Sequence, residues 1–312
     1  MSFIERFYFE SMPARRLAAV RVYVGLYATV YLLLRLPHLL RFATYDASIF
    51  APVGLASLLD APIAPGVYRG AVALTVALSF AFVLGFAHRL LAPLFAVLLV
   101  SVLTYTSSFG KILHTDNLLV LHVAVLAVAP CADALSIRAR GVAEPAPHGR
   151  YGWPIKLLCL VTVAAYFLAG IAKLRHSGLA FFDGENLRNY IAFDNVRKAE
   201  LGSISSPVGP WLLGFTPIFT GLAALSLALE LGAPLALVRR SIGRAWSVAV
   251  AGFHLGVLVL MAIGFAYPLT GAAFAAFFDL ERVRARRARS ASRAEEPVQI
   301  PREAAEREAR DA

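Results

Sequence analysis

The sequence predicts an all-α integral membrane protein, a polytopic helical bundle with about eight transmembrane segments. Of the 312 residues, 59% are hydrophobic and only 16% are charged, whereas soluble domains are roughly 45–50% apolar and about 25% charged. The apolar residues fall in runs close to the roughly 20 residues that a membrane-spanning helix needs. Basic residues lie between these runs, and the net charge is +10. Such basic connections are typical of membrane proteins.

Eight apolar runs divide the chain into predicted segments. The fourth and eighth are short, so a partial or re-entrant span is an alternative for each. The sixth is long enough to tilt or to begin as an interfacial turn. The runs cover residues 17–37, 69–87, 90–107, 117–131, 155–174, 212–238, 246–264 and 265–280.

The distribution of Lys and Arg predicts the topology. Alternate connections are rich in these residues, and six arginines lie between Arg282 and Arg293. The positive-inside rule then puts both termini in the cytoplasm of a multi-pass protein of the inner (plasma) membrane. We expect a membrane domain over residues 1–280 and a charged tail over 281–312, disordered or a short helix. The basic residues form no aromatic-interleaved patch, so we expect membrane lipid and not nucleic acid as the partner.

Lys173, Glu230 and His254 are ionisable residues within the apolar runs, where charge is costly and often functional. Lys173 closes the run 157–174. Taken alone it fits an interfacial anchor, but in a dry cavity it would be a neutral amine able to take a proton. Glu230 fits either a structural ion pair or a functional role. His254, between Gly252 and Gly256, fits either a hydrogen-bonded packing residue or a functional one.

Polar residues also precede and enter the fourth segment. The connection carries His114, Asp116 and Asn117, and His122 follows among apolar neighbours, where core packing is the favoured interpretation. Arg21, in the first segment, fits a side chain that reaches the cytoplasmic interface. Among His114, Asp116, His122, Glu230 and His254, no two residues form an i, i+3 or i, i+4 ligand pair, so we predict no metal site.

Several motifs, in the same order along the chain, resemble one known family. The segment Tyr166-Phe-Leu-Ala-Gly-Ile-Ala-Lys173-Leu174 is similar to the motif that carries the catalytic lysine in the membrane part of vitamin K-dependent gamma-glutamyl carboxylase. Further motifs resemble the bacterial relatives called horizontally transferred transmembrane (HTTM) domain proteins. These are Arg21-x-x-x-Gly25, Tyr45-Asp-Ala-Ser-Ile-Phe-Ala-Pro52, Glu230-Leu-Gly-Ala-Pro-Leu235, Phe253-His254 and Ile263-Gly-Phe-Ala-Tyr-Pro268.

The resemblance implies a lipophilic quinone or hydroquinone cofactor of the vitamin K type and oxygen-dependent chemistry of the carboxylase or epoxidase kind. It puts Lys173 at the position of the base that deprotonates the hydroquinone. The proton or oxyanion partner is then His114 or His254. Asn117, Tyr166 and Glu230 are the residues expected to bind the cofactor. Either Asn117 or His114 corresponds to a histidine of the family, and Glu230 and Arg21 are also candidates for charge pairing.

The chain departs from the carboxylase directly after the lysine motif. The family has a tryptophan there, whereas this chain reads Arg175-His-Ser-Gly-Leu-Ala180. A second interpretation is therefore a non-enzymatic accessory for maturation or export of a secreted peptide, similar to sporulation-delaying protein B of the same family. In that case the outer connection 175–211 holds the peptide and Lys173 only sets the end of a helix. A transporter is less favoured, since no inverted repeat is visible.

Overall fold

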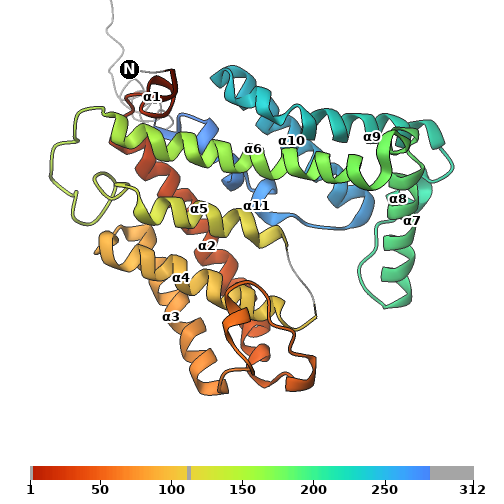
Figure 1. Cartoon of the computed structure of the whole chain (residues 1–312), viewed down its shortest axis with the longest axis horizontal. Helices are drawn as coiled ribbons and strands as arrows, with labels where there is room; N and C mark the ends of the chain where they lie inside the picture. The colour runs from red at the N-terminus through yellow and green to blue at the C-terminus, as the bar shows by residue number, and fades with distance from the viewer. Residues whose placement is uncertain (1–2, 111–113, 282–312) are drawn as a thin grey trace, which may run out of the picture. The chain divides into compact units, whose positions relative to one another are not determined.

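The computed structural model describes residues 3–110 and 114–281 (Figure 1), and its named elements are all helical. The chain divides into two units, Met1–Phe278 and Asp279–Ala312, and every element named below belongs to the first. All but one residue of the predicted tail 281–312 lies outside the described residues. The α-helices are α1 (Phe3–Tyr8), α2 (Ala14–Arg41), α3 (Pro65–Leu84), α4 (His88–Ser107), α5 (Asn117–Val128), α6 (Gly149–Ser177), α7 (Glu185–Glu200), α8 (Val208–Leu212), α9 (Thr216–Leu231), α10 (Arg240–Met261) and α11 (Ala266–Leu269). The 3₁₀ helices are η1 (Phe42–Thr44), η2 (Ala47–Ile49), η3 (Gly54–Leu58), η4 (His114–Asp116), η5 (Gly178–Asp183), η6 (Ala233–Leu237) and η7 (Ala272–Phe277).

Five helices of the described chain are long and apolar enough to cross a membrane, which indicates a membrane protein. They cover Ala14–Thr44, Pro65–Leu84, His88–Ser107, Gly149–Asp183 and Arg240–Met261. The predicted segments 117–131 and 212–238 contain the shorter apolar helices α5 and α9. The count of about eight segments and the cytoplasmic termini stay predictions.

The predicted eighth segment, 265–280, is broken into the short helices α11 and η7. All six residues of η7 are buried, and η7 packs against α2, α6 and α10. Gly271, with φ 79°, precedes η7 and turns the chain back into the bundle. This segment therefore contributes to the core of the bundle.

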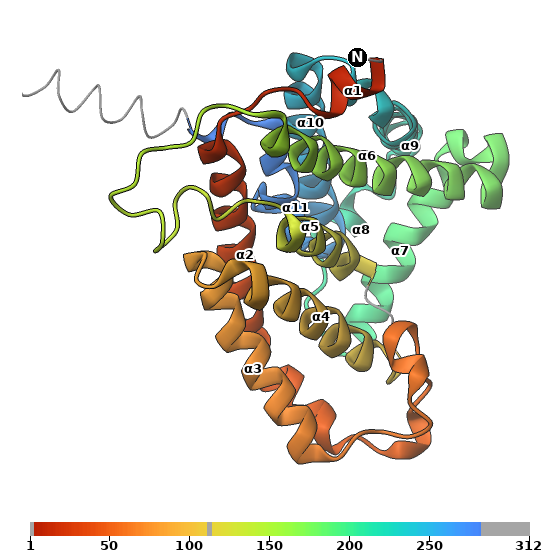
Figure 2. The ribbon, with the colours of Figure 1, turned by 60° about the vertical axis from the view of Figure 1, so that its left-hand side comes forward.

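The remaining helices pack in an order that follows the chain (Figures 1 and 2). Helices α2, α3, α4 and α5 pack each on the next, and α6 lies between α5 and α9. Helix α10 packs against α9, η6 and η7. Because α6 contacts neighbours on both sides, polar side chains on it meet residues that are distant in the sequence.

Arg21 does not reach the interface that the sequence suggested for it. It is fully buried, with 0% of its surface exposed, and it donates a hydrogen bond to the carbonyl of Leu135. Leu135 has the positive φ of 48° that directs this carbonyl inward. The turn between α3 and α4 needs glycine at position 85, since a Cβ there would lie 2.2 Å from Nη1 of Arg21. Arg21 thus joins α2 to the connection between α5 and α6, and Gly85 leaves room for its guanidinium.

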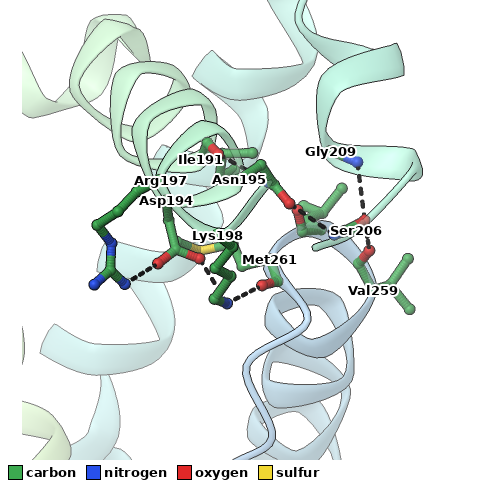
Figure 3. A network of polar contacts seen from close by, with 10 residues as sticks. Ile191, Asp194, Asn195, Arg197, Lys198, Ser206, Gly209, Val259 and Met261 are labelled. Carbon is green, nitrogen blue, oxygen red and sulfur yellow. Dashed lines mark hydrogen bonds and ion pairs between the residues drawn. The ribbon is translucent and has the colours of Figure 1, made fainter. Parts of the chain in front are cut away.

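The connection 175–211 is held by polar contacts to the end of α10 (Figure 3). Asn195 of α7 donates a hydrogen bond to the carbonyl of Leu260 at 2.9 Å, and Lys198 donates to the carbonyl of Met261 at 2.5 Å. Ser206 donates to the carbonyl of Val259 at 2.5 Å. The last carbonyls of a helix lack partners within it, so these three side chains cap α10. The charge of Lys198 also suits the negative end of the helix dipole.

Asp194 holds the side chain of Lys198, which caps the carbonyl of Met261. Its carboxylate accepts from Lys198 at 2.8 Å and from Arg197 at 3.0 Å. Burial raises the pKa of Asp194, but the hydrogen bonds from Lys198 and Arg197 outweigh it and lower that pKa overall. Asp194 therefore stays ionised at neutral pH and holds Lys198 against α10.

The cap predicts the effect of Asn195→Ala. The substitution removes the hydrogen bonds to the carbonyl of Leu260 and from the amide of Ser206, at a cost of about 1–3 kcal/mol. We expect faster tryptic cleavage after Arg197 and Lys198 and a lower unfolding temperature in detergent. Asn189→Ala, at an exposed position of the same helix, is the control. Equal cleavage rates in the two variants would contradict this account of α10.

Candidate functional site

Lys173 and Glu230 form an ion pair between α6 and α9. The Glu230 side chain is 6% exposed, and that of Lys173 is 29% exposed. The close approach depends on Gly170, because a Cβ there would lie 3.0 Å from Cβ of Glu230 and 2.9 Å from Cδ2 of Leu231. Lys173 is therefore a paired ammonium at the edge of the bundle, and Glu230 pairs with it and not with Arg21.

Tyr166 and His254 form a second polar contact, about two turns before Lys173 on α6. The Tyr166 hydroxyl lies 2.7 Å from Nε2 of His254, which α10 supplies. Trp246 and Phe274 pack around the Tyr166 ring, at centroid distances of 5.4 and 6.1 Å. His254 is 6% exposed, so this contact is shielded from solvent by aromatic rings.

Two polar atoms of this region have no hydrogen-bond partner within the described part of the chain. They are Oε2 of Glu230 and Nδ1 of His254, and both are buried. A buried polar atom without a partner is costly, so such atoms are natural contacts for a bound molecule. Tyr166 and Lys173 lie seven residues apart on α6, so the two pairs are about two helical turns apart along the same helix. We treat Tyr166, Lys173, Glu230 and His254 as one candidate site.

A cavity of about 290 Å³ lies close to this site. We call it the tyrosine cavity, because Tyr27, Tyr31 and Tyr267 line it. Phe265 also lines it, and its ring contacts the His254 ring in a tilted arrangement at a centroid distance of 5.0 Å. Phe265 therefore separates the tyrosine cavity from the polar pair that His254 makes with Tyr166.

The tyrosine cavity has one charged wall. Arg35 and Asp116 form an ion pair at 3.4 Å, and the Tyr31 hydroxyl bonds to both. Sequence reasoning missed Arg35, Tyr31 and Tyr27. Their spacing of i, i+4 and i+8 within the first apolar segment was the signal, because it puts all three on one helix face.

His122 is a buried core residue, as its apolar neighbours predicted. It is 2% exposed. Its Nδ1 lies 2.7 Å from the Tyr267 hydroxyl, and its Nε2 lies 3.0 Å from Oγ1 of Thr162. Both ring nitrogens are occupied, so His122 holds α5, α6 and α11 together behind the tyrosine cavity.

The other predicted site residues lie apart from this cluster or outside the description. Asn117 begins α5 and is exposed, and no described contact joins it to Lys173 or His254. The side chain of His114 lies outside the described residues. Among described residues, no three or more His, Cys, Asp or Glu side chains gather as metal ligands would.

No protein-family model matches the chain, and neither a curated protein nor a solved structure matches it.

A double-mutant cycle tests the ion pair between Lys173 and Glu230. Glu230→Leu leaves Lys173 unpaired, and Lys173→Met leaves the buried Glu230 carboxylate unpaired, so each should cost on the order of 3 kcal/mol. Lys173→Met should cost more, because Glu230 is the more buried partner. The double variant should recover most of the loss, since no unpaired charge remains. Thermal unfolding in detergent measures all four proteins, and additive losses would contradict the pair.

Proposed function

We propose that the chain is a multi-pass protein of the inner membrane, of the HTTM kind, that binds a lipophilic quinone or hydroquinone and uses Lys173 as a base. The observation that carries the proposal is that α6 supplies one member of each of two buried polar pairs, Lys173 with Glu230 and Tyr166 with His254, and that the His254 ring contacts Phe265 in the wall of the tyrosine cavity. About eight membrane segments, with both termini in the cytoplasm, remain part of the proposal. The shorter apolar helices α5 and α9 support the additional segments.

The residues present fit a hydroxylated aromatic ring. The tyrosine cavity has about 290 Å³, and such volumes with aromatic walls and few polar groups suit small ligands. Behind the Phe265 wall of this cavity, Nδ1 of His254 is buried without a hydrogen-bond partner in the described chain, and so is Oε2 of Glu230, which does not line the cavity. A bound hydroquinone would supply two electrons and two protons for the reduction of oxygen.

The ion pair decides how Lys173 can act as a base. A Lys173 ammonium beside a Glu230 carboxylate is already protonated. In an apolar environment two opposite charges are costly, and transfer of the proton from Nζ to Glu230 leaves both groups neutral. Lys173 is then an amine that can take a proton, as a general base must. Tyr166 and His254 orient a hydroxyl group next to it.

The base role predicts that Lys173→Ala and Lys173→Arg both abolish oxygen consumption with a short-chain vitamin K hydroquinone. Arg cannot release its proton at any relevant pH, and loss of a general base costs roughly 10²–10⁴ in rate. Oxygen uptake by the purified protein measures this, with Asn189→Ala as the control. Full activity of Lys173→Arg would exclude the base role and leave Lys173 as a structural partner of Glu230.

A second candidate function is that of an accessory for a secreted peptide. The observation that favours it is the exposure of large apolar side chains on the outer connection: Tyr190 is 66% exposed, and Phe193 and Trp211 are 68% exposed each. Exposed apolar clusters mark interaction surfaces. On this account the cap of α10 presents α7 and α8 to a peptide, and the Lys173–Glu230 pair is structural.

The accessory function predicts that a photo-crosslinking amino acid at position 193 captures a secreted peptide in intact cells. The same group at position 248, an exposed site on α10, should capture lipid only. Mass spectrometry of the adducts distinguishes the two. Lipid adducts alone at position 193, together with hydroquinone turnover, would reject the accessory function.

A further inference from the structure

A second cavity, of about 230 Å³, lies where α2, α6 and α10 begin. We call it the basic pocket. Its lining includes four cationic side chains and one carboxylate, which are Arg16, Lys156, Arg239, Arg240 and Glu10. It is separate from the tyrosine cavity and shares no lining residue with it. The excess of positive charge makes it a candidate site for an anion.

One anionic group already lies in the basic pocket, the carboxylate of Glu10. Its carboxylate pairs with Nζ of Lys156 at 2.8 Å and with Arg240. Burial raises the pKa of Glu10, but the hydrogen bond from Lys156 and the charges of Lys156, Arg240 and Arg16 outweigh it and lower that pKa overall. Glu10 is therefore a carboxylate at neutral pH, and it pairs with two of the four cationic side chains that line the pocket.

Two further features favour a phosphate group. Arg16 lines the pocket and is only 4% exposed. Its attraction for an anion is therefore stronger than that of a cation in water, because the surrounding dielectric is low. The residue before α10 is Arg239, whose side chain makes no capping hydrogen bond. The first amide groups of α10 thus begin at the pocket without a side-chain cap, and helix N-termini bind phosphate groups.

The rest of the lining is apolar. Phe7, Met12, Ile155 and Phe277 complete the pocket, and Lys156 lies 4.4 Å from the centroid of the Phe7 ring. Three of the helices long enough to span a membrane begin here. The pocket therefore combines cations with an apolar wall at the level where spanning helices start, as sites for phospholipid head groups do.

We infer that the basic pocket binds the phosphate group of an anionic phospholipid, with the glycerol and upper acyl carbons on the apolar wall and Glu10 as a competing internal anion. The inference does not depend on the quinone proposal, because the two cavities are distinct. The inference predicts opposite effects for the two kinds of charge. Removing the charge of Glu10 strengthens lipid binding, whereas removing the charge of Lys156 or Arg240 weakens it.

Native mass spectrometry of the full chain, released from nanodiscs of mixed phosphatidylglycerol and phosphatidylcholine, measures the preference for the anionic lipid. We expect Lys156→Gln and Arg240→Gln to lower the preference roughly fivefold each, and Glu10→Gln to raise it by a similar factor. Arg138→Gln, an exposed cation outside the pocket, should leave it unchanged. Thermal unfolding of each variant reports whether the fold is intact.

The inference fails if Lys156→Gln and Arg240→Gln change the preference no more than Arg138→Gln does. It also fails if Glu10→Gln lowers the preference or leaves it unchanged, because Glu10 would then be a structural partner and not a competitor. Excess inorganic phosphate should not displace phosphatidylglycerol. Displacement would mean that the apolar wall adds nothing and that the pocket serves a soluble anion.

Discussion

The close packing of α6 on α9 at Gly170 is the contact on which the candidate site depends. A Cβ at this position would lie 3.0 Å from Cβ of Glu230 and 2.9 Å from Cδ2 of Leu231, so glycine favours the close approach of the two helices. That approach gives Lys173 a buried carboxylate partner. Without it, Lys173 would have to reach the interface and Glu230 would be an isolated charge in an apolar bundle.

Most polar side chains inside the bundle join elements that are distant in the sequence. Tyr166 joins α6 to α10 through His254, His122 joins α5 to α6 and α11, and Arg21 joins α2 to the connection at Leu135. Polar groups in an apolar environment are costly unless they are bonded. Each such contact therefore specifies which helices can be neighbours.

Apolar run lengths were sufficient to predict the helical class and the long helices, and the isolated ionisable residues pointed to Lys173, Glu230 and His254. The partners were not predictable. Arg21 could have paired with Glu230 by charge alone, but it bonds a backbone carbonyl that the positive φ of Leu135 directs inward. The run 265–280 was apolar enough for a segment, yet Gly271 folds it into the core. Such outcomes depend on turns and on tertiary packing, which periodicity does not record.

The cap on the end of α10 has a mechanical consequence. Helix α10 carries His254 about two turns before the carbonyls that Asn195, Lys198 and Ser206 hold. Any displacement of α7 must either break these bonds or carry the end of α10 with it. A displacement of α7 that keeps these bonds therefore also moves the end of α10, the helix that supplies His254 to Tyr166.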